Sequence, residues 1–159
     1  MPVMKMKKRW LLLLVCIALP LLVGLLSALL SRSGMERFDA VIQPPLSPPA
    51  WLFPIVWTLL YASMGVASYL VLTSGNVQAN ALRAYGVQLI LNFFWSILFF
   101  NLQAYYFAFI WLLLLWAAVL VTTVLFYRIR PAAGILLIPY LVWITFAGYL
   151  NLAVAVLNP

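Results

Sequence analysis

The stretch WLLLLVCIALPLLVGLLSALL at residues 10–30 decides the fold class of this chain. It holds no charged side chain, and about 20 apolar residues in a helix cross the hydrocarbon core of a bilayer. The run exceeds the roughly 7–15 apolar residues of a signal peptide and no small-residue cleavage site follows it. We therefore predict a retained membrane helix, kinked at Pro20 because proline removes a backbone donor.

The rest of the chain has the same character. Hydrophobic residues make up 68% of the sequence and charged residues 7%, against about 45–50% and 25% in soluble domains. We predict an all-α membrane protein in which residues 1–159 form one five-helix bundle. The five spans are expected at about residues 10–30, 51–72, 83–100, 105–127 and 132–157.

The longest connection, at residues 31–50, contains four prolines and both acidic residues of the chain. Connections of this length are usually functional or disordered. Because prolines favour an extended and stiff path, we predict a lid over one end of the bundle.

The basic residues divide unevenly between the two ends that five spans would create. Arg32 and Arg37 fall on the side of the long loop, and the other seven fall on the opposite side: Lys5, Lys7, Lys8, Arg9, Arg83, Arg128 and Arg130. The positive-inside rule then predicts a cytoplasmic N-terminus and a C-terminus outside. Charges confined to span ends also argue against a nucleic-acid partner, which needs a basic face.

Ordinary hydrolytic and metal chemistry is excluded by composition. The chain has no histidine, two acids and a single cysteine, Cys16. It therefore lacks the side chains of zinc sites, Ser-His-Asp triads and carboxylate pairs. We expect no metal site and no required cofactor.

Polar and aromatic side chains inside the spans mark a candidate ligand site. Polar groups are costly in lipid and should face the bundle interior. One face of the third span carries Gln88, Asn92, Trp95 and Phe99. One face of the fifth span carries Tyr140, Trp143, Ala147 and Asn151. One face of the second span carries Trp51, Thr58 and Gly65. Three such faces are expected to enclose an apolar cavity with a few fixed polar groups.

A purely structural interpretation stands beside this one. Tryptophan and tyrosine gather at membrane interfaces, and buried amides often form interhelical hydrogen bonds without any ligand. From chemistry alone, ligand contact and structural bonding are equally good interpretations of Gln88, Asn92 and Asn151.

Three motifs resemble the TspO/translocator family, also called tryptophan-rich sensory protein or peripheral benzodiazepine receptor. They are PPAWLFPIVWTLLYASMG at residues 48–65, QLILNFFWSILFF at 88–100 and PYLVWITFAGYLN at 139–151. The resemblance covers nearly the whole chain, with the spans in the same order. It implies a bacterial five-helix protein, often a homodimer, that binds porphyrins and isoquinoline or benzodiazepine ligands beneath the first loop.

Carried over by position, the resemblance also implies which residues line the pocket. These are Trp51, Asn92, Trp95, Trp143, Ala147 and Asn151, with Phe107, Ile110 and Leu114 from the fourth span; Tyr61, Gln88 and Phe99 join them from the matching motifs. Two departures matter. Arg37-Phe38 replaces the family's usual Trp-Tyr pair before the loop, and the C-terminal Tyr and Arg of the proposed cholesterol motif are missing.

The leading hypothesis is a receptor or sensor that binds a porphyrin of the protoporphyrin IX type between Trp51 and Trp143. Asn92 would help to orient it, and Arg32 or Arg37 would pair with its propionates. In light, these indoles could donate an electron to the porphyrin and let oxygen break the macrocycle. The alternatives are a transporter of tetrapyrroles or lipids and a ligand-gated scaffold for a partner protein, in each case in a bacterial cell membrane.

Overall fold

The computed structural model describes residues 6–159, and every regular element in them is a helix. The elements are α1 (Met6–Phe38), α2 (Leu52–Leu72), α3 (Ala79–Ser96) with its π-helical continuation η1 (Ile97–Asn101), α4 (Tyr105–Ile129), α5 (Pro131–Ile135) and α6 (Ile138–Leu157). Five stretches are long and apolar enough to cross a membrane, α5 and α6 counting as one. The predicted five-span all-α class is confirmed.

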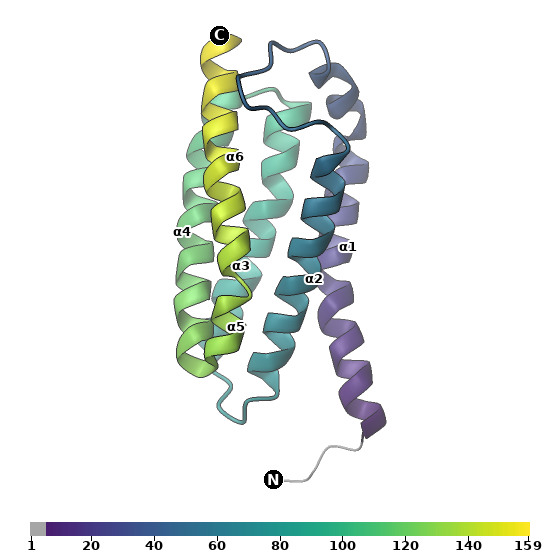
Figure 1. The fold of residues 1–159 in the computed structure, drawn as a ribbon, viewed down its shortest axis with the longest axis vertical. Helices are drawn as coiled ribbons and strands as arrows, with labels where there is room; N and C mark the ends of the chain where they lie inside the picture. Colours follow the sequence, from purple (N-terminus) through teal and green to yellow (C-terminus); the bar gives the residue numbers. More distant parts are fainter. Residues whose placement is uncertain (1–5) are drawn as a thin grey trace.

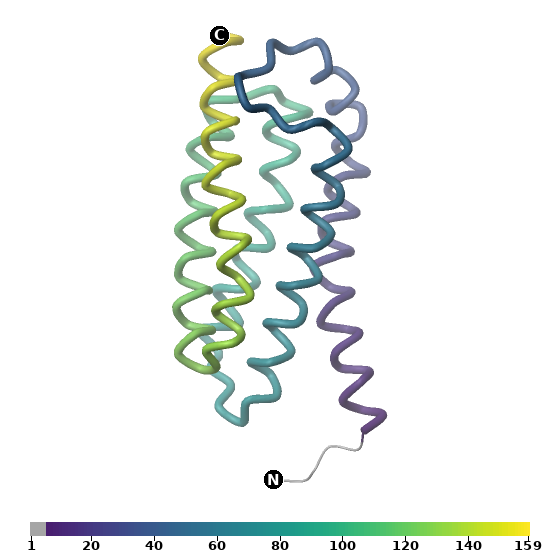
Figure 2. Tube along the Cα trace, viewed as in Figure 1, coloured from purple at the N-terminus to yellow at the C-terminus, as the bar shows by residue number. Residues whose placement is uncertain are grey.

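Consecutive spans run in opposite directions, so that the first described residues and the C-terminus lie at opposite ends of the bundle (Figure 1). Helix α1 packs on α2 and α3, and α6 packs on α4. The trace in Figure 2 shows the loop after α1 crossing the end of the bundle to reach α6 before it enters α2. Lys5, one of the basic residues counted above, lies outside the described residues.

Helix α1 is longer than the sequence suggested, because it continues to Phe38. Residues 31–38 contain no proline, and Arg32 and Glu36 form an ion pair one helical turn apart, 3.5 Å between nitrogen and oxygen. Both favour helix. The loop therefore covers residues 39–51, and the helix passes through Pro20 without a break.

The last span is interrupted at Leu136 and Leu137, between α5 and α6. Pro139 lies in the first turn of α6, where its missing N–H is tolerated but cannot continue the bonds of α5. The Ser63 hydroxyl of α2 donates to the carbonyl oxygen of Leu136 at 2.8 Å. This bond fastens α2 to the junction.

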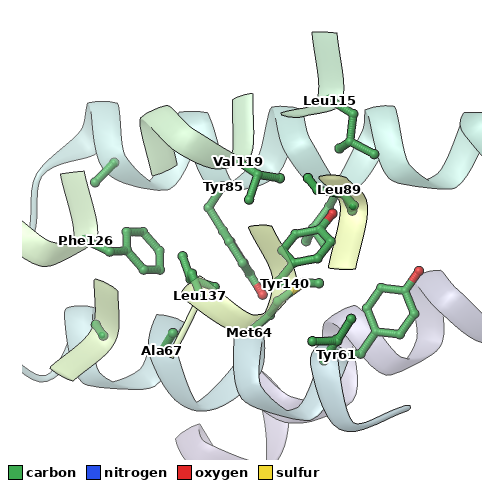
Figure 3. Packing of buried hydrophobic residues seen from close by; sticks show 14 of the residues in the cluster. Tyr61, Met64, Ala67, Tyr85, Leu89, Leu115, Val119, Phe126, Leu137 and Tyr140 are labelled. Carbon is green, nitrogen blue, oxygen red and sulfur yellow. The ribbon is translucent and has the colours of Figure 1, made fainter. Parts of the chain in front are cut away.

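Close packing and hydrogen bonds hold the spans together, since lipid removes the usual hydrophobic advantage of burying one helix against another. Gly65 of α2 lies against the backbone of Ile17, where an added Cβ would come within 2.4 Å of the Ile17 Cα. Figure 3 shows the buried cluster, including Met64, Phe126 and Tyr140 from α2, α4 and α6.

Candidate ligand-binding site

A buried polar network joins α2, α3 and α6 in the middle of the bundle. The Tyr61 hydroxyl donates to Asn92 Oδ1 at 2.8 Å, and Asn92 Nδ2 donates to the Tyr140 hydroxyl at 2.6 Å. The Tyr140 hydroxyl in turn donates to Gln88 Oε1 at 3.0 Å. Gln88 Nε2 completes the chain toward Met64 Sδ at 3.9 Å.

The amides of this network use their hydrogen-bonding capacity within the protein. Gln88 and Asn92 are 1% and 2% exposed, so an unpaired amide at either position would be strongly unfavourable. The prediction that these side chains face the interior and find partners is confirmed. Their direct effect is to fix the rings of Tyr61 and Tyr140.

A second cluster lies toward the loop end of the bundle. Trp95 Nε1 donates to Asn151 Oδ1 at 3.1 Å, and Asn151 Nδ2 donates to the Tyr105 carbonyl oxygen at 2.8 Å. The Trp95 ring stacks on Phe99 with centroids 5.2 Å apart, and Phe38 packs on the same phenyl ring at 5.2 Å. Phe38 therefore joins this aromatic cluster.

A groove of about 520 Å³ runs between α2 and α6. Its lining is almost entirely apolar and consists of Val56, Leu60, Ile138, Pro139, Val142, Trp143 and Phe146. Trp143 meets Phe53 of α2 edge to face, with centroids 5.9 Å apart. The indole Nε1 of Trp143 is buried and has no hydrogen-bond partner, which is unusual for a buried polar atom.

Trp57 connects the groove with the polar network. Its indole stacks on Tyr61 with centroids 5.4 Å apart and meets Tyr140 edge to face at 6.1 Å. Val56, which immediately precedes Trp57 in the chain, lines the groove. A molecule in the groove would thus lie beside rings whose positions the network fixes.

The loop at residues 39–51 is tied across the end of the bundle to α6. Asn158 accepts a hydrogen bond from the Ile42 N–H at 3.0 Å and donates to the Ile42 carbonyl oxygen at 3.1 Å. The Tyr149 hydroxyl donates to the Pro45 carbonyl oxygen at 2.9 Å. The loop therefore forms a roof with two attachments on α6.

Comparison with known proteins decides the family. Residues 16–157 match the TspO/MBR family. The chain belongs to the TspO/MBR family. It is 37% identical over 158 residues to a tryptophan-rich protein TspO of Chlorobaculum tepidum, covering 97% of this chain and 100% of that protein.

Other organisms carry relatives of the same TspO/MBR family. A translocator protein of Bos taurus is 38% identical, over 84% of this chain and 82% of its own length. A tryptophan-rich sensory protein of Cereibacter sphaeroides is 34% identical over 77% of both chains. Family membership supports a membrane sensor or translocator role, and with the five spans it makes this chain an integral multi-pass membrane protein.

The structure corrects the expected contribution of α2. Trp51 is 66% exposed at the start of α2, and Thr58 is exposed, with its hydroxyl bonded to the Pro54 carbonyl oxygen of its own helix. Gly65 faces α1. The stripe of Trp51, Thr58 and Gly65 therefore does not face an interior cavity, and none of the ring contacts in residues 6–159 joins Trp51 to Trp143.

The expectation for the fourth span was wrong. Phe107, Ile110 and Leu114 are 51%, 57% and 55% exposed and lie on the outer face of α4. The inward stripe of α4 consists of Tyr105, Ala108, Leu112, Leu115, Val119, Thr122 and Phe126. The two sets lie on different faces because a helix turns about 100° per residue.

The other predicted residues gather in three neighbouring places. Tyr61, Gln88 and Asn92 form the network, Trp95, Phe99 and Asn151 form the second cluster, and Trp143 lines the groove. Ala147 is buried in the core beside them. Sequence reasoning left out three rings that belong to this region, which are Phe53, Trp57 and Phe146.

The stripe predicted on the fifth span faces inward. Tyr140 shares the helical stripe of Ala147 and Asn151, and its burial at 1% exposure shows that this stripe is the inward one.

In residues 6–159, no group of three or more His, Cys, Asp or Glu side chains is placed to hold a metal ion.

Proposed function

We propose that the protein is a membrane receptor that binds a porphyrin or another flat apolar molecule in the groove between α2 and α6. The observation that carries this proposal is Trp143. Its ring forms part of the groove wall, and its buried N–H has no partner. A flat ligand with one acceptor atom would satisfy both the ring and the N–H.

The chemistry of the groove suits a large aromatic ring system. Stacking on an aromatic side chain adds about 0.5–1.5 kcal/mol beyond the burial of apolar area. Protoporphyrin IX and the isoquinoline or benzodiazepine ligands expected from the family all offer such faces. In this proposal, Gln88, Asn92 and Asn151 act by holding rings in place rather than by touching the ligand.

The charged end of a porphyrin would lie toward the loop, where Arg32 and Arg37 lie near the end of α1. Arg32 is paired with Glu36, whereas Arg37 donates from Nη2 to the Asn101 carbonyl oxygen at 3.3 Å. A propionate is a stronger acceptor than a backbone carbonyl. We therefore assign the propionate contact to Arg37.

The test is a titration of protoporphyrin IX into the protein in lipid nanodiscs, followed by quenching of tryptophan fluorescence. Trp143→Phe should weaken the affinity about fivefold through loss of a hydrogen bond worth about 1 kcal/mol. Trp10→Phe is the control, because Trp10 is 62% exposed near the start of α1. The proposal fails if the unaltered protein shows no saturable quenching.

A second proposed activity is the light- and oxygen-dependent breakdown of bound porphyrin, in which Trp143 donates an electron to the excited porphyrin and molecular oxygen is the oxidant. Its position in the groove wall favours this role, because indole is readily oxidised and would lie against the ligand. Trp143→Phe should then bleach bound porphyrin more slowly under illumination, whereas Trp51→Phe, at a ring that is 66% exposed, should not. Equal bleaching rates in both variants and in the unaltered protein would exclude the mechanism.

Transport of a tetrapyrrole or lipid is the alternative, and the lateral position of the groove favours it. Protein-dependent flux of protoporphyrin between liposomes would support transport, and its absence would leave the receptor. We also propose that the protein forms a homodimer, and that it acts, as a further alternative, as a ligand-gated scaffold for a partner protein. The molar mass in detergent, with and without protoporphyrin, tests the dimer, and ligand-dependent co-purification of a partner tests the scaffold.

A further inference from the structure

The contacts between helices are not equally strong around the bundle. Helix α3 is bonded to its neighbours through Ser27 to the Phe93 carbonyl, Tyr61 to Asn92, Trp111 to the Leu91 carbonyl and Asn92 to Tyr140. Helices α4 and α6 are bonded through Trp116 to Thr145, and α1 and α2 meet closely at a glycine. In the part of the chain that the structure describes, no side-chain hydrogen bond joins α2 to α6.

Two aromatic ring pairs span this contact, which we call the α2–α6 seam. Phe53 meets Trp143 and Trp57 meets Tyr140, both edge to face with centroids 5.9 and 6.1 Å apart. Such ring pairs form no hydrogen bond and can be displaced by rotation about side-chain bonds. The groove described above lies along this seam.

The seam is fastened at both of its ends. Toward α5, Ser63 holds the Leu136 carbonyl, and toward the loop, Tyr149 holds the Pro45 carbonyl. Helix α6 is also separated from α5 by the two non-helical residues before Ile138. The seam can therefore widen in the middle of the membrane while its ends stay in contact.

Entry from the aqueous side, through the roof, is more obstructed than entry through the α2–α6 seam. Asn158 bonds both backbone groups of Ile42, and Arg37 attaches the end of α1 to η1. Opening the roof would break several hydrogen bonds, whereas in the described residues no side-chain hydrogen bond runs directly from α2 to α6 across the seam. Side chains with no charge line the seam, as a molecule dissolved in lipid hydrocarbon requires.

We infer that the α2–α6 seam is a lateral portal, through which a flat apolar ligand dissolved in the bilayer reaches the rings inside the bundle. This inference rests on the proposed function and adds the route of access. The roof over residues 39–51 stays closed during passage. Trp57 and Phe53 act as the movable gate.

Reversible crosslinking tests the portal. In a Cys16→Ala background, Val56→Cys with Val142→Cys places two thiols across the seam, and Pro45→Cys with Tyr149→Cys places two thiols between roof and α6. Each pair is linked with a short bifunctional methanethiosulfonate reagent in proteoliposomes. Binding of protoporphyrin IX is followed by the rate of tryptophan quenching, before linking, after linking and after reduction.

Linking the seam should slow association about tenfold or more, because the conformational step is blocked. Reduction should restore the rate, which shows that the variant is folded. Protein loaded with protoporphyrin before linking should also release it more slowly. Linking the roof should change both rates by less than twofold.

A second comparison needs no crosslinker. Val56→Trp fills the groove and should slow association, whereas Leu59→Trp adds the same ring to a lipid-facing position that is 66% exposed and should not. If the unlinked protein binds but seam linking leaves its rates unchanged, the portal is overturned and the proposed function stands. If the unlinked protein does not bind, both fail.

Discussion

Two glycines show how differently one residue type acts in this bundle. A Cβ on Gly65 would lie 2.4 Å from the Ile17 Cα, whereas a Cβ on Gly86 would meet nothing within 4 Å. Gly65→Ala should destabilise the protein by about 2 kcal/mol, because backbone atoms cannot move aside cheaply. Gly86→Ala should stabilise it by about 0.5–1 kcal/mol through helix propensity. Equilibrium unfolding in mixed detergent micelles measures both changes in unfolding free energy. Changes of the same sign would contradict the different surroundings described for the two glycines.

Asn92 is the centre of the buried network, since it both accepts from Tyr61 and donates to Tyr140. Asn92→Ala should lower the free energy of unfolding by about 1–2 kcal/mol. Asn80→Ala, at an exposed position on the same helix, is the matched control. Combining Asn92→Ala with Tyr61→Phe should cost less than the sum of the two single changes, because they remove the same bond. Strict additivity would show that the bond contributes nothing.

The sequence predicted the inward residues of α3 better than those of α2 or α4. Gln88 and Asn92 were predictable because an amide facing lipid is costly. Trp51 and Phe107 carry no such penalty on the outside, so a ring at those positions fits either face. Helical periodicity gives the direction in which a side chain points from the axis of its helix. It does not give which neighbouring helix lies in that direction.

At the scale of elements, the five spans followed from apolar length, but their ends did not. Helix α1 continues to Phe38 because polar residues 31–38 gain helix contacts that composition does not reveal, including Gly34 against the backbone of Phe100. The π-helical turn η1 depends on how α3 meets α1 and α4. These are tertiary effects, and they override local propensity.

The attachment of the loop to α6 is also a property of elements rather than of single residues. Asn158→Ala removes both bonds to Ile42 and should speed hydrogen exchange of the Ile42 amide about tenfold, because that amide loses its acceptor. Asn76→Ala, in the connection between α2 and α3, should leave it unchanged. The measurement is hydrogen exchange with mass spectrometry on residues 39–51. Unchanged exchange there would show that the roof is held by other contacts.

At the scale of the whole molecule, the antiparallel path separates the charges into two groups. The start of α1, Arg83 near the start of α3 and Arg130 after α4 lie at one end of the bundle, and the loop with Arg37 lies at the other (Figure 1). The structure fixes which residues share an end, while the direction of the bundle in the membrane follows only from the positive-inside rule.

That rule makes a prediction which thiol labelling can check. In a Cys16→Ala background, Ser47→Cys lies in the roof loop and Ser74→Cys lies at the opposite end, after α2. Among the described residues, the basic side chains at the Ser74 end are Lys7, Lys8, Arg9, Arg83, Arg128 and Arg130, against Arg32 and Arg37 at the roof end. The Ser74 end should therefore stay in the cytoplasm. A membrane-impermeant maleimide added to intact cells should label Ser47→Cys fully and Ser74→Cys only after lysis. The reverse pattern would place the roof inside the cell, and labelling of both before lysis would show a mixed orientation that the charge difference fails to prevent.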